Sequence, residues 1–518
     1  MQRIQPSQPY ALFDRAATLR LEHAAAAQLP PHTLMQRAGL AVARLARALA
    51  PHARTVWIVC GTGNNGGDGL EAAIHLHQQL QRSGGRVLVT WLGQPDSAPP
   101  DAQQSWQRAR DAGVEFSDAA PTDLTPADVC IDALLGIGLS ADRRRTTAAT
   151  AATAAPNNPL HQLLQALHSS PATLLAVDVP SGLDADTGQY AAGFAPDNAS
   201  NTTNPTSARH TLSLLTLKPG LFTGAGRDAA GTVWLDDLAC APGIGVPSAW
   251  LSAPAPVSAR CHASHKGSFG DVAVIGGEGL QMRGRGMTGA ALLAGRAALH
   301  SGAGRVLVAL LDGGALQCDP QQPELMLRRF DALALEQLTV VCGCGGGEAV
   351  CAVLAPVLQH AARLVLDADA LNAIATDRTL QIALHQRAQR GHASVLTPHP
   401  LEAARLLHTN TAHVQAQRLQ AAQQLAERFG CVVVLKGSGT VIAAPNQIPR
   451  INPSGNARLA SAGTGDVLAG MVGAHWAASS ASAFEAASQA VFAHGLAADR
   501  WPAHRPLTAG LLAHSITS

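Results

Sequence analysis

Short apolar runs alternate with helix-length segments twice along this chain, once in each half. Such alternation predicts parallel sheets whose strands are joined by right-handed helical crossovers. A chain of 518 residues is also long for a single core. We therefore predict an α/β protein with two tandem domains. The runs that we predict as strands are Thr55–Cys60, Arg86–Val89, Val129–Ile131, Leu174–Val177, Asp271–Ile275, Arg305–Val308, Leu364–Leu366 and Cys431–Leu435.

The predicted boundaries follow from changes in composition along the chain. Residues Pro242–Pro256 combine Gly, Pro and Ser with little apolar periodicity, which is typical of a linker. We predict a first domain over residues 1–241, a linker over 242–259 and a second domain over 260–518. Residues 143–158 and 195–207 are rich in Thr, Ala, Asn and Pro, and we predict that they are surface insertions.

Charge and cysteine content narrow the functional class. The chain has 37 Lys and Arg against 36 Asp and Glu, which argues against binding nucleic acid or a membrane surface through net charge. No apolar run has the length of a membrane span, and residues 1–15 lack the apolar core of a signal peptide. The nine cysteines include no CxxC pair, which is typical of reduced thiols and argues against a zinc site. We expect a cytoplasmic protein that acts on small molecules.

One glycine-rich segment of the second half points to phosphate chemistry. Ser461–Asp466 precedes the apolar run Val467–Gly470. Small residues let the backbone approach an anion closely, and the first N–H groups of a helix over the apolar run would point at that anion. A carboxylate beside a phosphate site, here Asp466, handles a proton or a metal during phosphoryl transfer. The alternative is an ordinary Gly-rich loop capped by Asp.

A second glycine-rich segment, Gly61–Gly69, lies between a predicted strand and a helix predicted from about Gly69 to Ser83. This is where α/β sheets bind ligands. We expect its five glycines to permit positive φ and to expose backbone N–H groups. Asn64 and Asn65 offer carbonyl oxygens for a cation and amides for a ligand. The alternative is a turn-rich connection, since Asn-Gly and Asp-Gly form turns.

Two more polar segments follow predicted strands of the first half. They begin at Asp132 and at Asp178. If these strand ends are neighbours, Asn65, Asp132 and Ser181 could together ligate a hard monovalent or divalent cation through oxygen. Asp178 would then remain free for acid/base chemistry. Taken singly, each Asp is more often a cap or turn residue.

The first half resembles the NAD(P)H-hydrate epimerase domain over about residues 1–240. The resemblance lies in Leu34–Gly39, GNNGGDG at 63–69, DALLGIGL at 132–139, VDVPSG at 177–182 and Lys218–Leu221. It implies a Rossmann-like three-layer α/β/α fold and a potassium site at Asn65, Asp132 and Ser181. The segment after Leu139 departs from the family pattern. The contacts implied for the hydrated nicotinamide substrate are Asn64, Asn65, Gly66, Gly67, Asp68, Gly136, Ile137, Gly138, Leu139, Ser140, Ala141, Asp142 and Asp178.

The second half resembles the ribokinase-like, ADP-dependent NAD(P)H-hydrate dehydratases over about residues 260–515. The motifs are HKGxxG at 265–270, DADALN at 367–372, TPHPxE at 397–402, LKGxxT at 435–440 and GNxxLAxxGTGDVLAG at 455–470. The resemblance implies Mg²⁺ with ADP or ATP. The implied nucleotide contacts are Lys436, Gly437, Ser438, Gly439, Thr440 and Gly465. The implied substrate contacts are Ala290, Gly345, His399 and Asp466.

Two departures and several alternatives accompany this resemblance. The family's GPGLG becomes Gly343–Gly347 with Cys344 in place of Pro, and Leu401 replaces the Gly of TPHPGE. Lys436 could be a solvated lysine at a strand end, and His399 a rigid-turn residue between two prolines. Asp367 and Asp369 could be helix caps.

Together the two resemblances imply a bifunctional repair enzyme for hydrated NADH and NADPH. The first domain would interconvert the R and S epimers, with Asp178 as acid/base. The second would dehydrate the S epimer with ADP or ATP, with Asp466 taking the hydroxyl proton. The resemblance also implies a homo-oligomer. One alternative is a kinase of a small alcohol whose first domain senses a ligand. Another makes the first domain a non-catalytic binding module.

Overall fold

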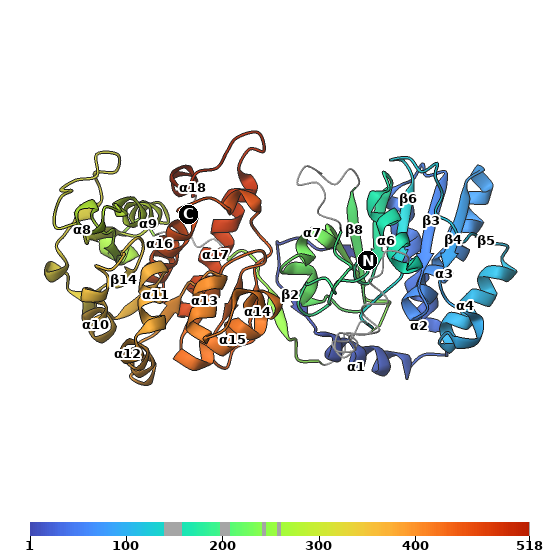
Figure 1. Cartoon of the computed structure of the whole chain (residues 1–518), viewed down its shortest axis with the longest axis horizontal. Helices are drawn as coiled ribbons and strands as arrows, with labels where there is room; N and C mark the ends of the chain where they lie inside the picture. The colour runs from blue at the N-terminus through green and yellow to red at the C-terminus, as the bar shows by residue number, and fades with distance from the viewer. Residues whose placement is uncertain (139–157, 197–207, 241–244, 256–260, 517–518) are drawn as a thin grey trace. The chain divides into compact units, whose positions relative to one another are not determined.

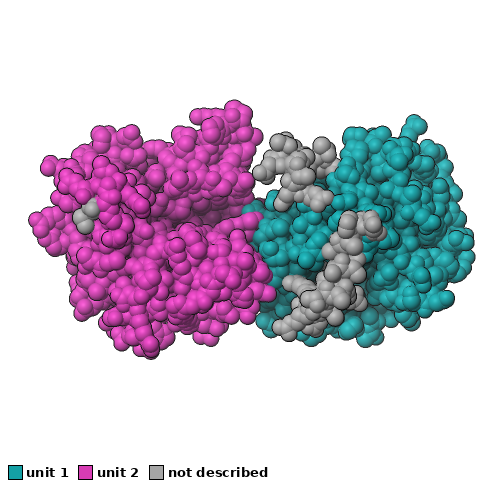
Figure 2. All heavy atoms as spheres, viewed as in Figure 1, with its two compact units in different colours: residues 1–5, 11–248 teal, residues 6–10, 249–518 magenta. Residues whose placement is uncertain are grey.

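The computed structural model describes residues 1–138, 158–196, 208–240, 245–255 and 261–516. The chain forms two compact units (Figure 2). Unit 1 comprises residues 1–5 and 11–248, and unit 2 comprises residues 6–10 and 249–518. Each unit is described by itself. Most of the two predicted insertions and the expected contacts Leu139, Ser140, Ala141 and Asp142 lie outside the described residues.

Unit 1 is built on an eight-stranded sheet (Figure 1). In spatial order its strands are β1 (Gln2–Arg3), β9 (Thr232–Asp236), β8 (Arg209–Leu214), β7 (Thr173–Val177), β6 (Val129–Ala133), β3 (Thr55–Cys60), β4 (Arg86–Trp91) and β5 (Glu115–Phe116). All neighbours are parallel except β1 and β9. The chain runs outward from β3 to β5 and then returns to β6 on the other side of β3. Ligands bind at the carboxyl ends of strands beside such a reversal.

Helices cover both faces of this sheet, which confirms the three-layer prediction. They are α1 (Arg15–Ala26), α2 (Thr33–Leu49), α3 (Asn64–Leu80), α4 (Pro100–Asp111), α6 (Pro159–Ser169) and α7 (Gly226–Ala230). Successive side chains of a strand point to opposite faces. Val56 and Ile58 of β3 accordingly pack in one apolar cluster with α2 and α3, whereas Trp57 packs in another with α6.

The sequence-based start of helix α3 was wrong, and so was the positive φ expected for the glycines of Gly61–Gly69. Helix α3 begins at Asn64, five residues before Gly69. None of the five glycines between 61 and 69 has positive φ. A Cβ added at Gly66 would lie 2.1 Å from the carbonyl oxygen of Gly61, and one at Gly69 would lie 2.6 Å from the Cβ of Ala133. Gly66 and Gly69 are therefore needed for close packing of α3 against the strand ends.

Unit 2 contains ten strands of one sheet. In spatial order they are β13 (Met326–Leu327), β12 (Arg305–Leu310), β11 (Asp271–Gly276), β14 (Thr339–Cys342), β15 (Arg363–Leu366), β16 (Ser394–Leu396), β17 (Val432–Leu435), β18 (Val441–Ala443), β19 (Arg450–Ile451) and β10 (Ala249–Leu251). In this spatial order, all neighbours from β13 through β12 and β11 to β17 are parallel. Strand β18 lies antiparallel to both β17 and β19. The order reverses between β11 and β14, so a ligand site is expected at their carboxyl ends.

Strand β10 lies inside the segment that the sequence predicted to be a linker, residues 242–259. It pairs in parallel with β19, and Trp250 lies opposite Arg450. Ala249 and Leu251 are fully buried while Trp250 is half-buried. This alternation extends over only three residues, which is too short to stand out among Gly, Pro and Ser.

Two apolar clusters fill the two faces of the unit 2 sheet. One contains residues of α9 (Thr288–His300), α16 (Thr464–Ala477), α17 (Ala483–Arg500) and α18 (Ala509–Ser515). The other contains residues of α10 (Cys351–His360), α11 (Ala368–Thr376), α12 (Arg378–Gln389), α13 (Pro400–Leu407), α14 (Thr411–Ala416) and α15 (Arg418–Phe429). A Cβ at Gly470 would meet the carbonyl oxygen of Ala294 at 2.0 Å, so small residues let α16 lie close to α9.

Two further features concern the whole described chain. All nine cysteines are free thiols. Among the described residues, no helix has both the length and the apolar character that crossing a membrane requires.

Candidate active sites

Unit 1 contains a cavity of about 1170 Å³ at the carboxyl ends of its parallel strands. Helix α1, the start of α3 and the loop after β6 contribute to its wall, as do residues that follow β7 and β8. Six polar or loop residues of the wall matter for the chemistry: Glu22, Asn64, Asp68, Gly136, Asp178 and Lys218. Several substrate contacts expected from the sequence therefore line one cavity.

Asp178 follows β7 and has a φ of 66°, a left-handed conformation that is uncommon for residues other than Gly. Its side chain is nearly buried. Its Oδ1 accepts a hydrogen bond from the backbone N of Leu214 at 3.1 Å and pairs with the ammonium of Lys218. Lys218 is fully buried and also donates to the carbonyl oxygens of Leu214 and Thr216, at 2.8 and 3.0 Å. This network fixes the position of the Asp178 carboxylate.

Two other acids line the cavity. Burial raises the pKa of Asp68 well above its ordinary value, and the negative charges of Asp178 and Glu22 raise it further. Burial also raises the pKa of Glu22, followed by the charge of Asp178. Glu22 lies on α1, outside every motif, and the sequence offered no signal for it.

Of the three expected cation ligands, Asn65 lines this cavity, and Asp132 and Ser181 are hydrogen-bonded to each other. The hydroxyl of Ser181 donates to Asp132 Oδ1 at 2.5 Å, and the backbone N of Ser181 donates to Oδ2 at 2.9 Å. Burial raises the pKa of Asp132. Asn65 lies against Gly136, where an added Cβ would be 3.1 Å from Asn65 Oδ1. Its Nδ2 is buried and has no hydrogen-bond partner among the described residues. A buried carboxylate, a hydroxyl and the amide oxygen of Asn65 are ligands of the kind that a hard cation prefers. The unsatisfied Nδ2 is a hydrogen-bond donor, so it points to an acceptor and not to the cation.

In unit 2, Asp466 lies in the first turn of α16. The sequence predicted a helix that follows Asp466, but the helix begins two residues earlier, at Thr464, after Gly463 with a φ of 88°. Burial raises the pKa of Asp466 to about 6, and the charge of Asp367 adds to the rise while that of Lys436 opposes it. The first free amides of α16 therefore lie beside a carboxyl group that titrates near neutral pH.

Asp367 connects three elements at the carboxyl edge of the unit 2 sheet. Its Oδ1 accepts from the hydroxyl of Thr397 at 2.7 Å and pairs with Lys436 Nζ at 2.7 Å. A Cβ added at Gly465 would lie 3.4 Å from Lys436 Nζ. The ends of β15 and β17 and the start of α16 thus meet at one point. Asp367 occupies the residue before α11 but makes no side-chain capping bond, and Asp369 instead accepts from the backbone N of Gly347 at 2.8 Å.

The loop after β17 adopts a conformation that needs glycine. Gly437 and Gly439 have φ of 134° and 64°. The buried guanidinium of Arg418 donates to the carbonyl oxygens of Leu435, Lys436 and Gly439 at 3.2, 3.2 and 3.4 Å. Burial lowers the pKa of Arg418 to about 10. Arg418 holds the loop that includes the expected nucleotide contacts, and it lies outside the motifs that predicted them.

The chain was compared with known families and proteins. Residues 31–220 match the family described as YjeF-related protein N-terminus, and residues 272–518 match NAD(P)H-hydrate dehydratase. The bifunctional NAD(P)H-hydrate repair enzyme Nnr of Escherichia coli (strain K12) is 35% identical over 512 residues, which cover 94% of this chain and 88% of that protein. The chain belongs to the bifunctional NAD(P)H-hydrate repair enzyme family.

Two further relatives each match about half of this family member. The ADP-dependent (S)-NAD(P)H-hydrate dehydratase of Neisseria meningitidis serogroup B is 42% identical over 274 residues, covering 51% of this chain and 88% of that protein. The ADP/ATP-dependent NAD(P)H-hydrate dehydratase of Bacillus subtilis, crystallised with ATP and Mg²⁺, is 30% identical. It covers 50% of this chain and 92% of that chain, with a TM-score of 0.42.

His399 of this repair-enzyme family member caps α13. Its Nδ1 accepts from the backbone N of Leu401 and Glu402 at 3.1 and 3.3 Å, so the rigid-turn role applies to this nitrogen. Its Nε2 lies 3.2 Å from Glu402 Oε1. Burial raises the pKa of Glu402 to about 7. Glu402 is the last residue of TPHPxE, and the sequence assigned it no role.

The remaining expected substrate contacts lie near the start of α9. Gly345 has a φ of 57°, and a Cβ there would be 2.8 Å from the Cβ of the buried Ala290. Nearby, the buried Glu278 accepts from the backbone N of Glu348 at 3.0 Å and pairs with Arg283 at 2.7 Å. This ion pair supports the loop after β14, and the sequence offered no signal for it.

Proposed function

We propose that the chain repairs hydrated NADH and NADPH. Unit 1 interconverts the R and S epimers, and unit 2 converts the S epimer to NAD(P)H. ADP or ATP drives this second step, and AMP and phosphate are released when ADP is used. The observation that carries the proposal is Asp466 at the start of α16, beside Lys436 and Asp367, in a chain of this family. We propose catalytic domains over residues 1–241 and 260–518, joined by residues 242–259.

The dehydration needs a better leaving group than hydroxide. Asp466 takes the proton of the substrate hydroxyl, and the hydroxyl oxygen attacks the terminal phosphoryl group of the nucleotide. The amides from Gly463 to Gly465 stabilise charge on the transferred group. The lone pair of the ring nitrogen then expels phosphate, and loss of a ring proton restores the reduced nicotinamide. A pKa of about 6 leaves Asp466 mostly ionised at neutral pH, as a base requires.

The nucleotide is held by Lys436, the loop Gly437–Thr440 and Gly465. The ammonium of Lys436 supplies positive charge next to the helix start, where phosphates bind. The carboxylates of Asp367 and Asp466 are oxygen ligands of the kind that Mg²⁺ accepts together with phosphates. Mg²⁺ would neutralise phosphate charge when bound. Ala290, Gly345 and His399 are proposed contacts of the hydrated ring.

In unit 1, Asp178 is the proposed acid and base. Both described hydrogen bonds to its carboxylate reach Oδ1, so we assign proton transfer to Oδ2. Protonation of the hydroxyl lets the ring nitrogen expel water, and return of water to the other face, with its proton taken by Asp178, gives the other epimer. The contacts proposed at Asn64–Asp68 and Gly136–Gly138 would orient the ring.

Asn65, Asp132 and Ser181 would hold K⁺. Their carboxylate, hydroxyl and amide oxygens suit a hard cation. The cation would anchor the loops after β3, β6 and β7. A cytoplasmic location and a homo-oligomer stay predictions.

Incubating purified protein with mixed epimers, with and without ADP, tests the proposal. Complete conversion to NAD(P)H with ADP supports both activities. Conversion of only the S half leaves unit 1 as a binding module. The kinase alternative predicts that a phosphorylated product accumulates, without recovery of the reduced-nicotinamide absorbance.

A further inference from the structure

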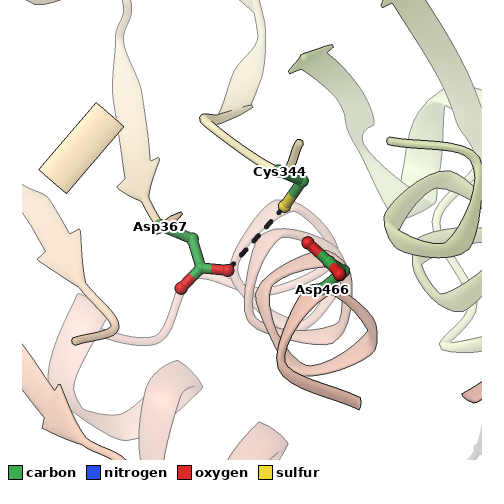
Figure 3. Close-up of side chains that lie close together, drawn as sticks. All are labelled: Cys344, Asp367 and Asp466. Atoms are coloured by element: carbon green, nitrogen blue, oxygen red, sulfur yellow. Dashed lines mark hydrogen bonds between the residues drawn. The ribbon is translucent and has the colours of Figure 1, made fainter. Parts of the chain in front are cut away.

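Three side chains from separate elements converge at the carboxyl edge of the unit 2 sheet (Figure 3). Cys344 follows β14, Asp367 follows β15, and Asp466 lies in the first turn of α16. One ligand atom from each lies within 4.8 Å of the other two. Cys344 and Asp367 are buried and Asp466 is half-buried, so the cluster is reached from the Asp466 side. Cys344 stands where the resembling family has Pro.

The thiol lies next to both carboxylates. Its Sγ donates a weak hydrogen bond to Asp367 Oδ2 at 3.9 Å and lies within 4.8 Å of a carboxylate oxygen of Asp466. Lys436 and Thr397 bind the other oxygen of Asp367, Oδ1. The oxygen facing the thiol can therefore ligate a cation while the ion pair with Lys436 stays in place.

The spacing suits a metal after small side-chain movements. Zn–S bonds of 2.3 Å and Zn–O bonds near 2.1 Å put tetrahedral ligand atoms roughly 3.5 Å apart. Each of the three ligand atoms would have to move by about 1 Å or less toward the metal to reach this spacing. A thiolate favours soft or borderline ions such as Zn²⁺ over Mg²⁺, which prefers oxygen alone. Two carboxylates against one ammonium also leave negative charge for a cation to compensate.

We propose that Cys344, Asp367 and Asp466 bind one thiophilic divalent cation, of which Zn²⁺ is the prototype, with water as the fourth ligand. As the metal–sulfur bond forms, the thiol proton leaves to solvent. The bound ion occupies the carboxylate of Asp466 and so inhibits unit 2. The binding site rests on these three side chains alone, whereas the inhibition rests on the proposed function.

Co²⁺ is the probe for binding, because a cobalt–thiolate bond gives an intense near-ultraviolet charge-transfer band. The three exposed cysteines of the full chain are first replaced, by Cys261→Ser, Cys318→Ser and Cys351→Ser, and this triple variant is the background protein. This background is expected to bind one equivalent of Co²⁺ with the thiolate band, which excess Zn²⁺ abolishes. Adding Cys344→Ala removes the band. A band that is missing from the background, or that survives Cys344→Ala, overturns the site.

A second variant guards against misfolding of Cys344→Ala. Asp466→Asn keeps the thiol but removes one oxygen ligand, so it should weaken Co²⁺ binding at least about tenfold. Unchanged affinity in Asp466→Asn overturns the three-ligand site. Zn²⁺ should also inhibit ADP-dependent dehydration in the background protein, a chelator should reverse this, and Cys344→Ala should resist it. Absence of any dehydration refutes the proposed function while the cobalt spectra still decide the site.

Discussion

Replacing Asp466 by Asn separates catalysis from stability within one unit. Asn removes the base that accepts the hydroxyl proton, so dehydration of the S epimer should slow by about 10²–10⁴-fold. Epimer exchange in unit 1 should proceed at the wild-type rate, which provides a control within the same molecule. In the wild type, the dehydration rate should rise with pH through about 6 as Asp466 ionises, and Asn should abolish this rise.

The same substitution should stabilise unit 2. The pKa of Asp466 rises from 3.8 to about 6 on folding, which corresponds to about 3 kcal/mol. Because the side chain is partly open to solvent, we take about 1–2 kcal/mol as the stability that ionised Asp466 costs unit 2. A raised carboxyl pKa means that the folded state holds the proton more tightly, so stability from this group falls as pH rises from about 3.8 to about 6. The increase in the free energy of unfolding caused by Asn should be absent below about pH 3.8 and complete above about pH 6.

Calorimetry of the full chain and an epimer-resolved dehydration assay measure both effects. A gain of this size should raise the unfolding temperature of unit 2 by about 2–6 °C at neutral pH. Asp331→Asn, an exposed carboxylate of the same unit, is the matched control and should change neither property. A variant that keeps more than a tenth of the dehydration rate contradicts the role of Asp466 as base. A lower unfolding temperature contradicts the electrostatic argument.

Three further predictions concern unit 1. Asp178→Asn should slow epimer exchange by about 10²–10⁴-fold, so that ADP-dependent conversion stops at the S half; full conversion at the wild-type rate contradicts its role. Lys218→Met should leave the Asp178 carboxylate unpaired and lower the free energy of unfolding of unit 1 by about 3–5 kcal/mol. Combining both substitutions should recover part of that loss, measured by denaturant titration, and no recovery argues against a coupled pair. Exchanging K⁺ for a bulky organic cation should lower the unfolding temperature of unit 1, and Ser181→Ala should reduce that difference; equal temperatures in both salts exclude the potassium site.

The strands of the parallel sheets could be predicted because their signal is local. Val129–Ile131 and Val432–Leu435 are apolar at every position, and polar or glycine-containing segments follow them. Their parallel direction also follows from the helical crossovers, which place the loops after the strands at one edge of the sheet. This is why Asp178 could be selected before any geometry was known, whereas Asp466 was selected from the glycine-rich segment before α16.

Glycine chemistry was predictable in kind but not in detail. In unit 2, Gly437 after β17 and Gly463 before α16 take positive φ. In the unit 1 loop, the same residue type serves close packing, since Gly66 and Gly69 have strand-end atoms within 2.6 Å of an added Cβ. A sequence shows that a side chain is absent, whereas only the packed structure shows whether backbone conformation or a neighbouring atom requires the absence.

The sequence assigned no role to three buried charged residues, and one physical reason explains all three omissions. Lys218, Arg418 and Glu278 are nearly or fully buried, and each satisfies several backbone or side-chain partners from other elements. A charged residue in a sequence is usually solvated, so composition favours the surface for all three. Burial becomes tolerable only when a second charge and backbone groups meet it, and those partners lie as far as 70 residues away in the case of Glu278 and Glu348. Positioning charges of this kind can therefore be found only after the sheet edge has been assembled, while the groups that they position are found from the motifs.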